Sequence, residues 1–506
     1  MTLIGNRRPS ADRPPSASYQ EILSSTAWIG GSSVINVGIG VIRTKALAML
    51  LGPAGFGLMG MLTSIADLTR SIAEMGLNSA GVRQIAEASS SGDRDRIART
   101  VAVLRLTALG LGTVGAAMLL TLAAPVANLT FGDYVHTSAV ALVSLAVFFR
   151  LVSDAQGALL QGLRRVADVA KVNVLSALIG TVASVPLVYW LREEGVALAL
   201  VIVAATAAAA SWWYSRKLQI ASPSSLTMTE AKQEVKALLS LGVALMVSGM
   251  LTMGAAYVVR LLLVQDHGLE DAGLYQAAWT LGGLCVGFVL QSMGTDFYPR
   301  LVGVAQDHEA CNRLVDEQTR ASVLLASAGV LATIALSPVL VSLLYSNQFR
   351  EAAPALRWIC LGMALRVLSW PMGFILVARG ERGLFFATEL AWTIVNLGLS
   401  WWLIQRYGAI GAGIAFFASY VFHLALLYPI VRRRTGFRWS PGTAMVGAGF
   451  LTACIAATVA FHFLPTAVAA ILGSSIAAAA GCYSMRAFRA LLRLPCTVSS
   501  GVDEKI

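Results

Sequence analysis

The sequence has 506 residues, of which 57% are hydrophobic and 13% are charged, and its formal net charge is +11 at pH 7. A soluble domain carries about a quarter charged residues, so this composition excludes a soluble globular protein. Uncharged apolar runs such as 195–214 are long enough to cross a bilayer as helices, which takes roughly 20 residues. The composition therefore predicts an all-α polytopic membrane protein.

In chain order, a polar tail at 1–24 precedes fourteen predicted transmembrane helices. The apolar stretch after this tail is too long for a signal-peptide core and lacks a cleavage site, so it is interpreted as a retained first span. The predicted spans are 25–50, 55–80, 101–124, 136–160, 170–191, 195–215, 237–264, 272–297, 320–344, 354–378, 384–404, 411–431, 442–463 and 466–488.

The distribution of basic residues predicts the orientation of these spans. The even-numbered gaps and the two tails hold 28 Lys and Arg residues, whereas the odd-numbered gaps hold four. Because cytoplasmic loops are enriched in Lys and Arg, both termini are predicted to be cytoplasmic. Short basic loops along one membrane face indicate anionic membrane lipids as neighbours and no nucleic acid. The loops are also too short for a catalytic domain, so the protein is predicted not to be an enzyme.

The chain contains an internal repeat. Arg43 recurs as Arg260 at an offset of 217 residues, and Arg150 recurs as Arg366 at an offset of 216. The first copy continues with Ala54-Gly55 and Met75-Gly76, and the second with Ala272-Gly273 and Met293-Gly294. Because six spans separate the copies, they are parallel repeats, an arrangement that transporters use around a central site.

This repeat predicts two pseudo-symmetric six-helix lobes around a central cavity, plus a terminal helix pair. The predicted divisions are a cytoplasmic tail at 1–24, an N-lobe at 25–215, a cytoplasmic linker at 216–236, a C-lobe at 237–431, the terminal pair at 442–491 and a cytoplasmic tail at 492–506.

Six basic residues fall inside the predicted spans. Each costs about 2.5–3.5 kcal/mol to insert when it faces lipid, so most are expected to face a wet interior. Lys45 and Arg260 lie near outer span ends, where snorkelling is the alternative. The six residues are Arg43, Lys45, Arg70, Arg150, Arg260 and Arg366.

Helical spacing groups polar residues on single faces of three of these spans. The faces consist of Ser32, Asn36 and Arg43 in the first span, of Asp67, Ser71, Glu74 and Asn78 with Arg70 adjacent in the second, and of Arg150, Asp154, Gly157 and Gln161 in the fourth. Intrahelical ion pairs of Arg70 with Glu74 and of Arg150 with Asp154 are the structural alternative.

Three of the arginines have no acidic residue three or four positions away, namely Arg43, Arg260 and Arg366. They are the best candidates for binding an anion, because the guanidinium fork grips phosphate oxygens and stays charged in poor solvent. Other motifs are weaker. Gly110-Leu-Gly112-Thr-Val-Gly115 sits in a span and is interpreted as helix-packing glycines. His423 is a weak candidate for a proton relay, and no cofactor, metal site or disulfide is predicted.

The first 90 residues resemble a known family. The matching residues are Thr26-Ala-Trp28 through Arg43-Thr-Lys45, then Leu51-Gly-Pro-Ala-Gly-Phe-Gly57 and Glu74-Met-Gly-Leu77. They are similar to O-antigen and enterobacterial-common-antigen translocases, which are polysaccharide flippases of the multidrug/oligosaccharidyl-lipid/polysaccharide exporter superfamily. The chain departs from many O-antigen translocases in having fourteen predicted spans instead of twelve, and in its Pro-rich tail. The extra helix pair looks more like that of lipid II flippases, where it borders a lipid-tail groove.

The resemblance implies a flippase of the bacterial inner membrane that moves an undecaprenyl-diphosphate-linked oligosaccharide, such as an O-antigen or exopolysaccharide repeat unit, by alternating access. It also implies a proton or sodium counter-ion, and a glycan polymerase and chain-length proteins as partners in lipopolysaccharide or polysaccharide biosynthesis. The implied roles are diphosphate binding for Arg43, Arg70, Arg150, Arg260 and Arg366, ion coupling or gating for Asp67, Glu74 and Asp154, and polar lining for Ser32, Asn36, Ser71, Asn78 and Gln161. A multidrug exporter of the same superfamily, or a membrane glycan polymerase or ligase, is the alternative.

Overall fold

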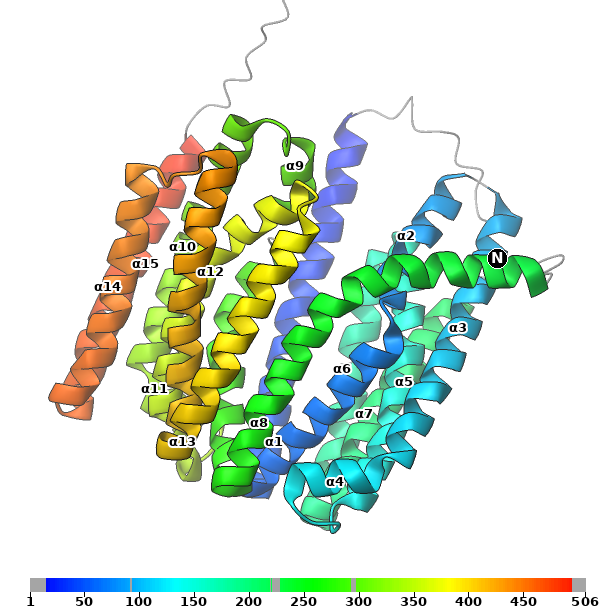
Figure 1. The fold of residues 1–506 in the computed structure, drawn as a ribbon, viewed down its shortest axis with the longest axis horizontal. Helices are drawn as coiled ribbons and strands as arrows, with labels where there is room; N and C mark the ends of the chain where they lie inside the picture. The colour runs from blue at the N-terminus through cyan, green and yellow to red at the C-terminus, as the bar shows by residue number, and fades with distance from the viewer. Residues whose placement is uncertain (1–14, 92, 219, 221–227, 293–296, 494–506) are drawn as a thin grey trace, which may run out of the picture. The chain divides into compact units, whose positions relative to one another are not determined.

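The computed structural model describes residues 15–91, 93–218, 220, 228–292 and 297–493, and these residues form helices and short connections without a strand (Figure 1). The chain divides into two compact units, 1–257 and 258–506. The ends of both predicted tails (1–14 and 494–506), part of the predicted linker and the Met293-Gly294 pair of the repeat lie outside the described residues.

The first unit is a bundle built around α5. This helix packs against α2, α3 and α7, while α1 packs against α5 and α6. The helix bounds are α1 Pro15–Glu74, α2 Leu77–Ser90, α3 Arg94–Thr121, α4 Ala123–Phe131, α5 Thr137–Gly162, α6 Val166–Leu191, the 3-10 helix η1 Arg192–Glu194, and α7 Gly195–Arg216. Helix α8, Met228–Ser292, begins in the first unit and ends in the second.

The second unit is a bundle in which α12 packs against α10 and α13. The last two helices, orange and red in Figure 1, pack against α10 and against each other. The bounds are α9 Tyr298–Gly303, α10 His308–Ala335, α11 Ser337–Leu344, the 3-10 helix η3 Asn347–Phe349, α12 Ala352–Ala378, α13 Arg382–Thr435, α14 Pro441–Phe463 and α15 Thr466–Arg493.

Three of the long helices are broken by a glycine with positive φ: α1 at Gly52, α8 at Gly268 and α13 at Gly408. Counted across these breaks, the described part contains six long helical segments before residue 217, six between 228 and 435, and two after 441. Nine stretches of the described part have the length and hydropathy of a membrane span, and three of them, of 44, 51 and 54 residues, are long enough for two crossings. The all-α, polytopic prediction is confirmed.

Matching backbone breaks show that the two units repeat one pattern. Gly52 has φ 65° and ψ −174°, and Gly268, 216 residues later, has φ 84° and ψ −177°. Arg192 has φ 53° and ψ −130°, and Gly408, again 216 residues later, has φ 52° and ψ −132°. The same offset therefore relates the turn between the first and second spans, and the turn between the fifth and sixth, to their counterparts in the second unit.

Small residues allow close helix approach, as is common between membrane helices. A Cβ at Gly115 would lie 2.6 Å from the Cβ of Ala73, and one at Gly112 would lie 3.2 Å from the ring of Phe148. A Cβ at Gly110 would meet nothing within 4 Å. Two of the three glycines in the GxGxxG motif thus pack between helices.

The break in α8 yields a test of the fold. At Gly268 the backbone combination of φ 84° and ψ −177° is one that essentially only glycine adopts, and an added Cβ would meet nothing within 4 Å. Gly268→Ala is therefore expected to destabilise the protein by about 1–3 kcal/mol through backbone strain alone. Thermal unfolding in detergent measures this. Gly283→Ala in the same helix, where a Cβ also meets nothing, is the matched control and should leave the melting temperature unchanged or higher.

Candidate functional site

Five charged side chains form a network between α1 and α5. Asp67, Arg70 and Glu74 lie on one face of α1, because residues three and four apart are neighbours on a helix. Arg150 and Asp154 lie one turn apart on α5. The two helices pack against each other, which brings the two polar faces together.

The ion pairs of this network run mainly across the two helices. Arg70 Nη1 lies 2.9 Å from Glu74 Oε2 and 2.9 Å from Asp154 Oδ2. Arg150 pairs with Asp67. The intrahelical alternative therefore holds for Arg70 and Glu74, whereas Arg150 and Asp154 each take a partner on the other helix.

The network is only partly buried. The exposed fractions of its side chains run from 16% for Glu74 to 34% for Arg150. Its two arginines and three carboxylates carry a formal charge of −1, which a third arginine offsets. Arg43 is close enough to Arg150 for the two cations to repel each other, and within the described part of the chain it has no hydrogen bond or ion pair. The first unit thus holds a half-buried cation beside a compensated network.

Arg260, in the second unit, is held by its own helix hairpin. It is buried, and its Nε donates a hydrogen bond to Gln276 Oε1 at 2.9 Å. Its guanidinium carbon lies 5.7 Å from the centre of the Tyr275 ring. Arg260 therefore has polar and aromatic partners from the other half of α8, although the sequence around it contains no acidic residue at helical spacing.

Arg366 on α12 is the least satisfied of the predicted arginines. Its guanidinium carbon lies 5.7 Å from the centre of the Trp370 ring, and its Nε is buried without a hydrogen-bond partner. Among the described residues its side chain forms no ion pair within 4 Å. It does act electrostatically on Glu389 and His423 of α13.

Glu389 is a charged residue of this region that sequence reasoning missed, and His423 was identified only weakly. His423 Nε2 lies 3.7 Å from Glu389 Oε1. The search for acidic partners of Arg366 covered positions three and four residues away on one helix, whereas Glu389 lies on the neighbouring helix. An acidic residue within the predicted span 384–404 was the signal that was available.

The predicted polar lining has several outcomes within the first unit. The backbone N–H of Asn78 donates to Glu74 Oε1 at 3.3 Å, and the side-chain Oδ1 of Asn36 is buried without a hydrogen-bond partner. Ser32 and Ser71 are half-buried, whereas Gln161 is exposed. Asn78 therefore touches the charged network directly, while a cavity-lining role for the other four stays a prediction.

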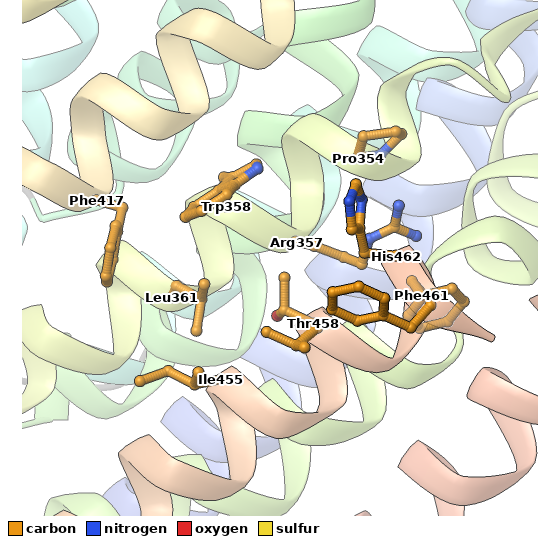
Figure 2. Close-up of a pocket in the computed structure, with 11 residues that line it drawn as sticks. Pro354, Arg357, Trp358, Leu361, Phe417, Ile455, Thr458, Phe461 and His462 are labelled. Carbon is orange, nitrogen blue, oxygen red and sulfur yellow. The ribbon is translucent and has the colours of Figure 1, made fainter.

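A pocket of about 500 Å³ lies between α12, the second half of α13 and α14. Figure 2 shows the guanidinium of Arg357 beside His462 at one end and Leu361, Phe417 and Ile455 at the other. Arg357 donates a hydrogen bond to Ser337 Oγ at 3.3 Å and lies 4.3 Å from the centre of the Phe461 ring. The pocket is thus mainly apolar, with one cation at its end, and none of the predicted site arginines lines it.

The described residues contain no group of three or more His, Cys, Asp or Glu side chains that could hold a metal ion. Cys311, Cys360, Cys454 and Cys482 are free thiols. The geometry of the charged clusters is therefore that of a binding surface for a charged ligand, built from arginines, carboxylates and aromatic rings.

Comparisons with known proteins agree with this geometry. The chain is similar to the lipid III flippase of Escherichia coli (strain K12), with 23% identity over 423 residues, which cover 82% of this chain and 99% of that protein. Among solved structures, it is similar to an inward-facing multidrug resistance MATE family transporter of the MOP superfamily, with a TM-score of 0.68, 13% identity, and coverage of 80% and 98%. It is also similar to the lipid II flippase MurJ in an inward closed conformation, with a TM-score of 0.65, 13% identity, and coverage of 93% and 100%.

These structural similarities show that the chain has the two-lobe fold of this superfamily. The family model for lipid II flippase MurJ matches residues 271–481, which include the terminal helix pair. The family model described as polysaccharide biosynthesis protein matches residues 46–354, more than half of the chain. The chain is therefore a member of the polysaccharide biosynthesis protein family.

Proposed function

We propose that this protein is a flippase that moves an undecaprenyl-diphosphate-linked oligosaccharide from the cytoplasmic to the periplasmic leaflet of the bacterial inner membrane. The observation that carries the proposal is the state of Arg43 and Arg366. Both lie inside membrane-spanning helices, and neither side chain forms a hydrogen bond or an ion pair among the described residues. A charge inside a membrane span is costly and usually functional, so these cations await an anionic ligand.

A diphosphate-linked glycan matches these side chains chemically. Arginine binds phosphate oxygens through two parallel N–H bonds and keeps its charge in a poorly solvated site. Arg70, Arg150 and Arg260 complete the set of diphosphate-binding residues in this proposal. The carboxylates of Asp67, Glu74 and Asp154 release or recapture arginines as the two lobes alternate in access, coupled to a proton or sodium ion.

The same proposal gives the protein its surroundings. Both termini face the cytoplasm, where basic loops lie against anionic lipid. The product in the outer leaflet is an O-antigen-like or exopolysaccharide repeat unit, which a glycan polymerase and chain-length proteins extend. The N-lobe at 25–215, the linker at 216–236, the C-lobe at 237–431 and the terminal pair at 442–491 are the working divisions.

Drug efflux is the alternative that the MATE structures suggest. A cavity for cationic drugs needs free carboxylates, whereas all three carboxylates of the first unit are already engaged by arginines. The charges without a partner are basic. This difference in sign favours an anionic cargo.

The test is flipping by the purified full-length protein in proteoliposomes. Transfer of a fluorescent diphosphate-linked oligosaccharide lipid between leaflets is measured by quenching of the exposed label, and ethidium uptake is measured in parallel. We expect protein-dependent transfer of the lipid, inhibition by soluble farnesyl diphosphate, and no ethidium movement. Ethidium transport without lipid transfer would overturn the proposal in favour of drug efflux.

A further inference from the structure

The second unit contains a buried polar seam where α12 meets the two halves of α13. Glu389 and Trp392 come from the first half of α13, and Tyr420 and His423 come from the second. The break at Gly408 folds α13 back on itself, so residues 34 positions apart in the sequence meet face to face. Arg366 reaches this seam electrostatically from α12.

The aromatic rings enclose the imidazole of His423. Its ring centre lies 6.5 Å from that of Trp392 and 5.8 Å from that of Tyr420, both in edge-to-face geometry. His423 is only 7% exposed. The gap of 3.7 Å between His423 Nε2 and Glu389 Oε1 is too long for a hydrogen bond but short enough for an ion pair once the imidazole is charged.

Several polar atoms of the seam lack partners. His423 Nδ1, Trp392 Nε1 and Arg366 Nε are buried without a hydrogen bond. Folded proteins leave very few such atoms, and each one calls for an explanation such as an absent water or ion. Three together in one seam, around a carboxylate and an imidazole, indicate a site that takes up a small ligand.

We infer that Glu389 and His423 form a proton-binding site whose occupancy sets the charge beside Arg366. This inference rests on the proposed function, because it makes the diphosphate affinity of Arg366 depend on the proton. One proton from water adds to the imidazole, no other bond breaks, and the imidazolium then pairs with the Glu389 carboxylate.

The charge of the seam decides the coupling. Arg366, Glu389, Tyr420 and His423 are the charged or titratable groups that face one another here from α12 and α13 in the described part of the chain. With a neutral imidazole their formal charge is zero, and with one bound proton it is +1. An anion beside Arg366 therefore binds more tightly to the protonated seam, and by linkage the anion favours proton binding.

The first experiment detects the proton without any transport. A protonated imidazole quenches the fluorescence of a neighbouring indole, and Trp392 is one of 11 tryptophans. We therefore compare the pH titration of the full-length protein with that of Trp392→Phe, and assign the difference to Trp392. We expect acid quenching that disappears in His423→Gln and that requires a lower pH in Glu389→Gln, because the attracting carboxylate is gone.

His308→Gln is the matched control, because His308 is exposed at the start of α10, outside the seam; it should titrate like the natural protein. Acid quenching that persists in His423→Gln would overturn the proton site. Quenching that follows added sodium at constant pH would also overturn it, in favour of a metal cation.

The second experiment measures the coupling. Farnesyl diphosphate is bound to the detergent-purified protein at about pH 6 and about pH 8, on either side of the ordinary range of histidine. One added unit charge near the anion is expected to tighten binding by about tenfold at the lower pH. His423→Gln and Glu389→Gln should lose this dependence, and they also control for ionisation of the ligand itself.

The two experiments separate the two hypotheses. Quenching by Trp392 with no farnesyl diphosphate binding at either pH would leave the proton site standing and remove the proposed function. Binding of farnesyl diphosphate with the same pH dependence in His423→Gln as in the natural protein would retain the function and overturn the coupling.

Discussion

Arg366→Ala is expected to abolish lipid-linked oligosaccharide flipping while the protein still inserts and folds. The side chain forms no hydrogen bond or ion pair in the described part of the molecule, so its removal leaves no acceptor stranded. The stability loss is limited to the cation–π contact with Trp370 at 5.7 Å, worth about 0.5–2 kcal/mol. The transport loss is large, because a diphosphate loses one of its charged anchors in a poorly solvated site.

The measurement pairs flipping in proteoliposomes with thermal unfolding of the same sample. Arg366→Lys should recover only part of the rate, because an ammonium keeps the charge but loses the fork. Arg43→Ala should behave like Arg366→Ala. A normal flipping rate in both alanine variants would remove the diphosphate role of these residues.

Arg260→Ala is the informative contrast. Its removal leaves Gln276 Oε1 without the 2.9 Å hydrogen bond in a region where Arg260 itself is 7% exposed. A buried group left unsatisfied costs about 1–3 kcal/mol. We therefore expect Arg260→Ala to lower the melting temperature as well as flipping, so that a fall in flipping alone at Arg366 is recognised as a loss of function.

Asp67→Asn is expected to give the second large effect, a loss of both stability and flipping. The substitution leaves Arg150 without the carboxylate with which it pairs across the α1–α5 contact. Removing one partner of a fully buried pair costs roughly 3–5 kcal/mol. The cost here is smaller, because Arg150 is 34% exposed and water screens part of its charge.

The double variant Asp67→Asn with Arg150→Gln separates stability from function. Removing both charges of a pair is often close to neutral, so the melting temperature should largely recover while flipping stays absent. Glu87→Gln, which breaks the exposed Arg83–Glu87 pair with side chains 64% and 52% exposed, should change neither quantity. If the double variant flips normally, the network serves packing alone.

Membrane crossing is a property that the chain encodes locally, which is why the sequence predicts it well. The cost of inserting a segment is close to a sum over its own residues, so the apolar runs alone locate fourteen helical segments. The repeat was equally accessible, because Arg43 with Arg260 and Arg150 with Arg366 preserve an offset that reappears in the backbone breaks at Gly52 and Gly268. Polar faces on the second and fourth spans also follow from helical periodicity.

The choice of partner across helices depended on the tertiary structure. Periodicity allowed Arg150 to pair with Asp154, yet packing of α5 on α1 gives it Asp67 and gives Asp154 to Arg70. Gln276 reaches Arg260, and Glu389 approaches both His423 and Arg366, only because chain breaks and helix packing join distant residues. Electrostatic and hydrogen-bond energies depend on distances between side chains, and sequence spacing determines those distances only within one helix.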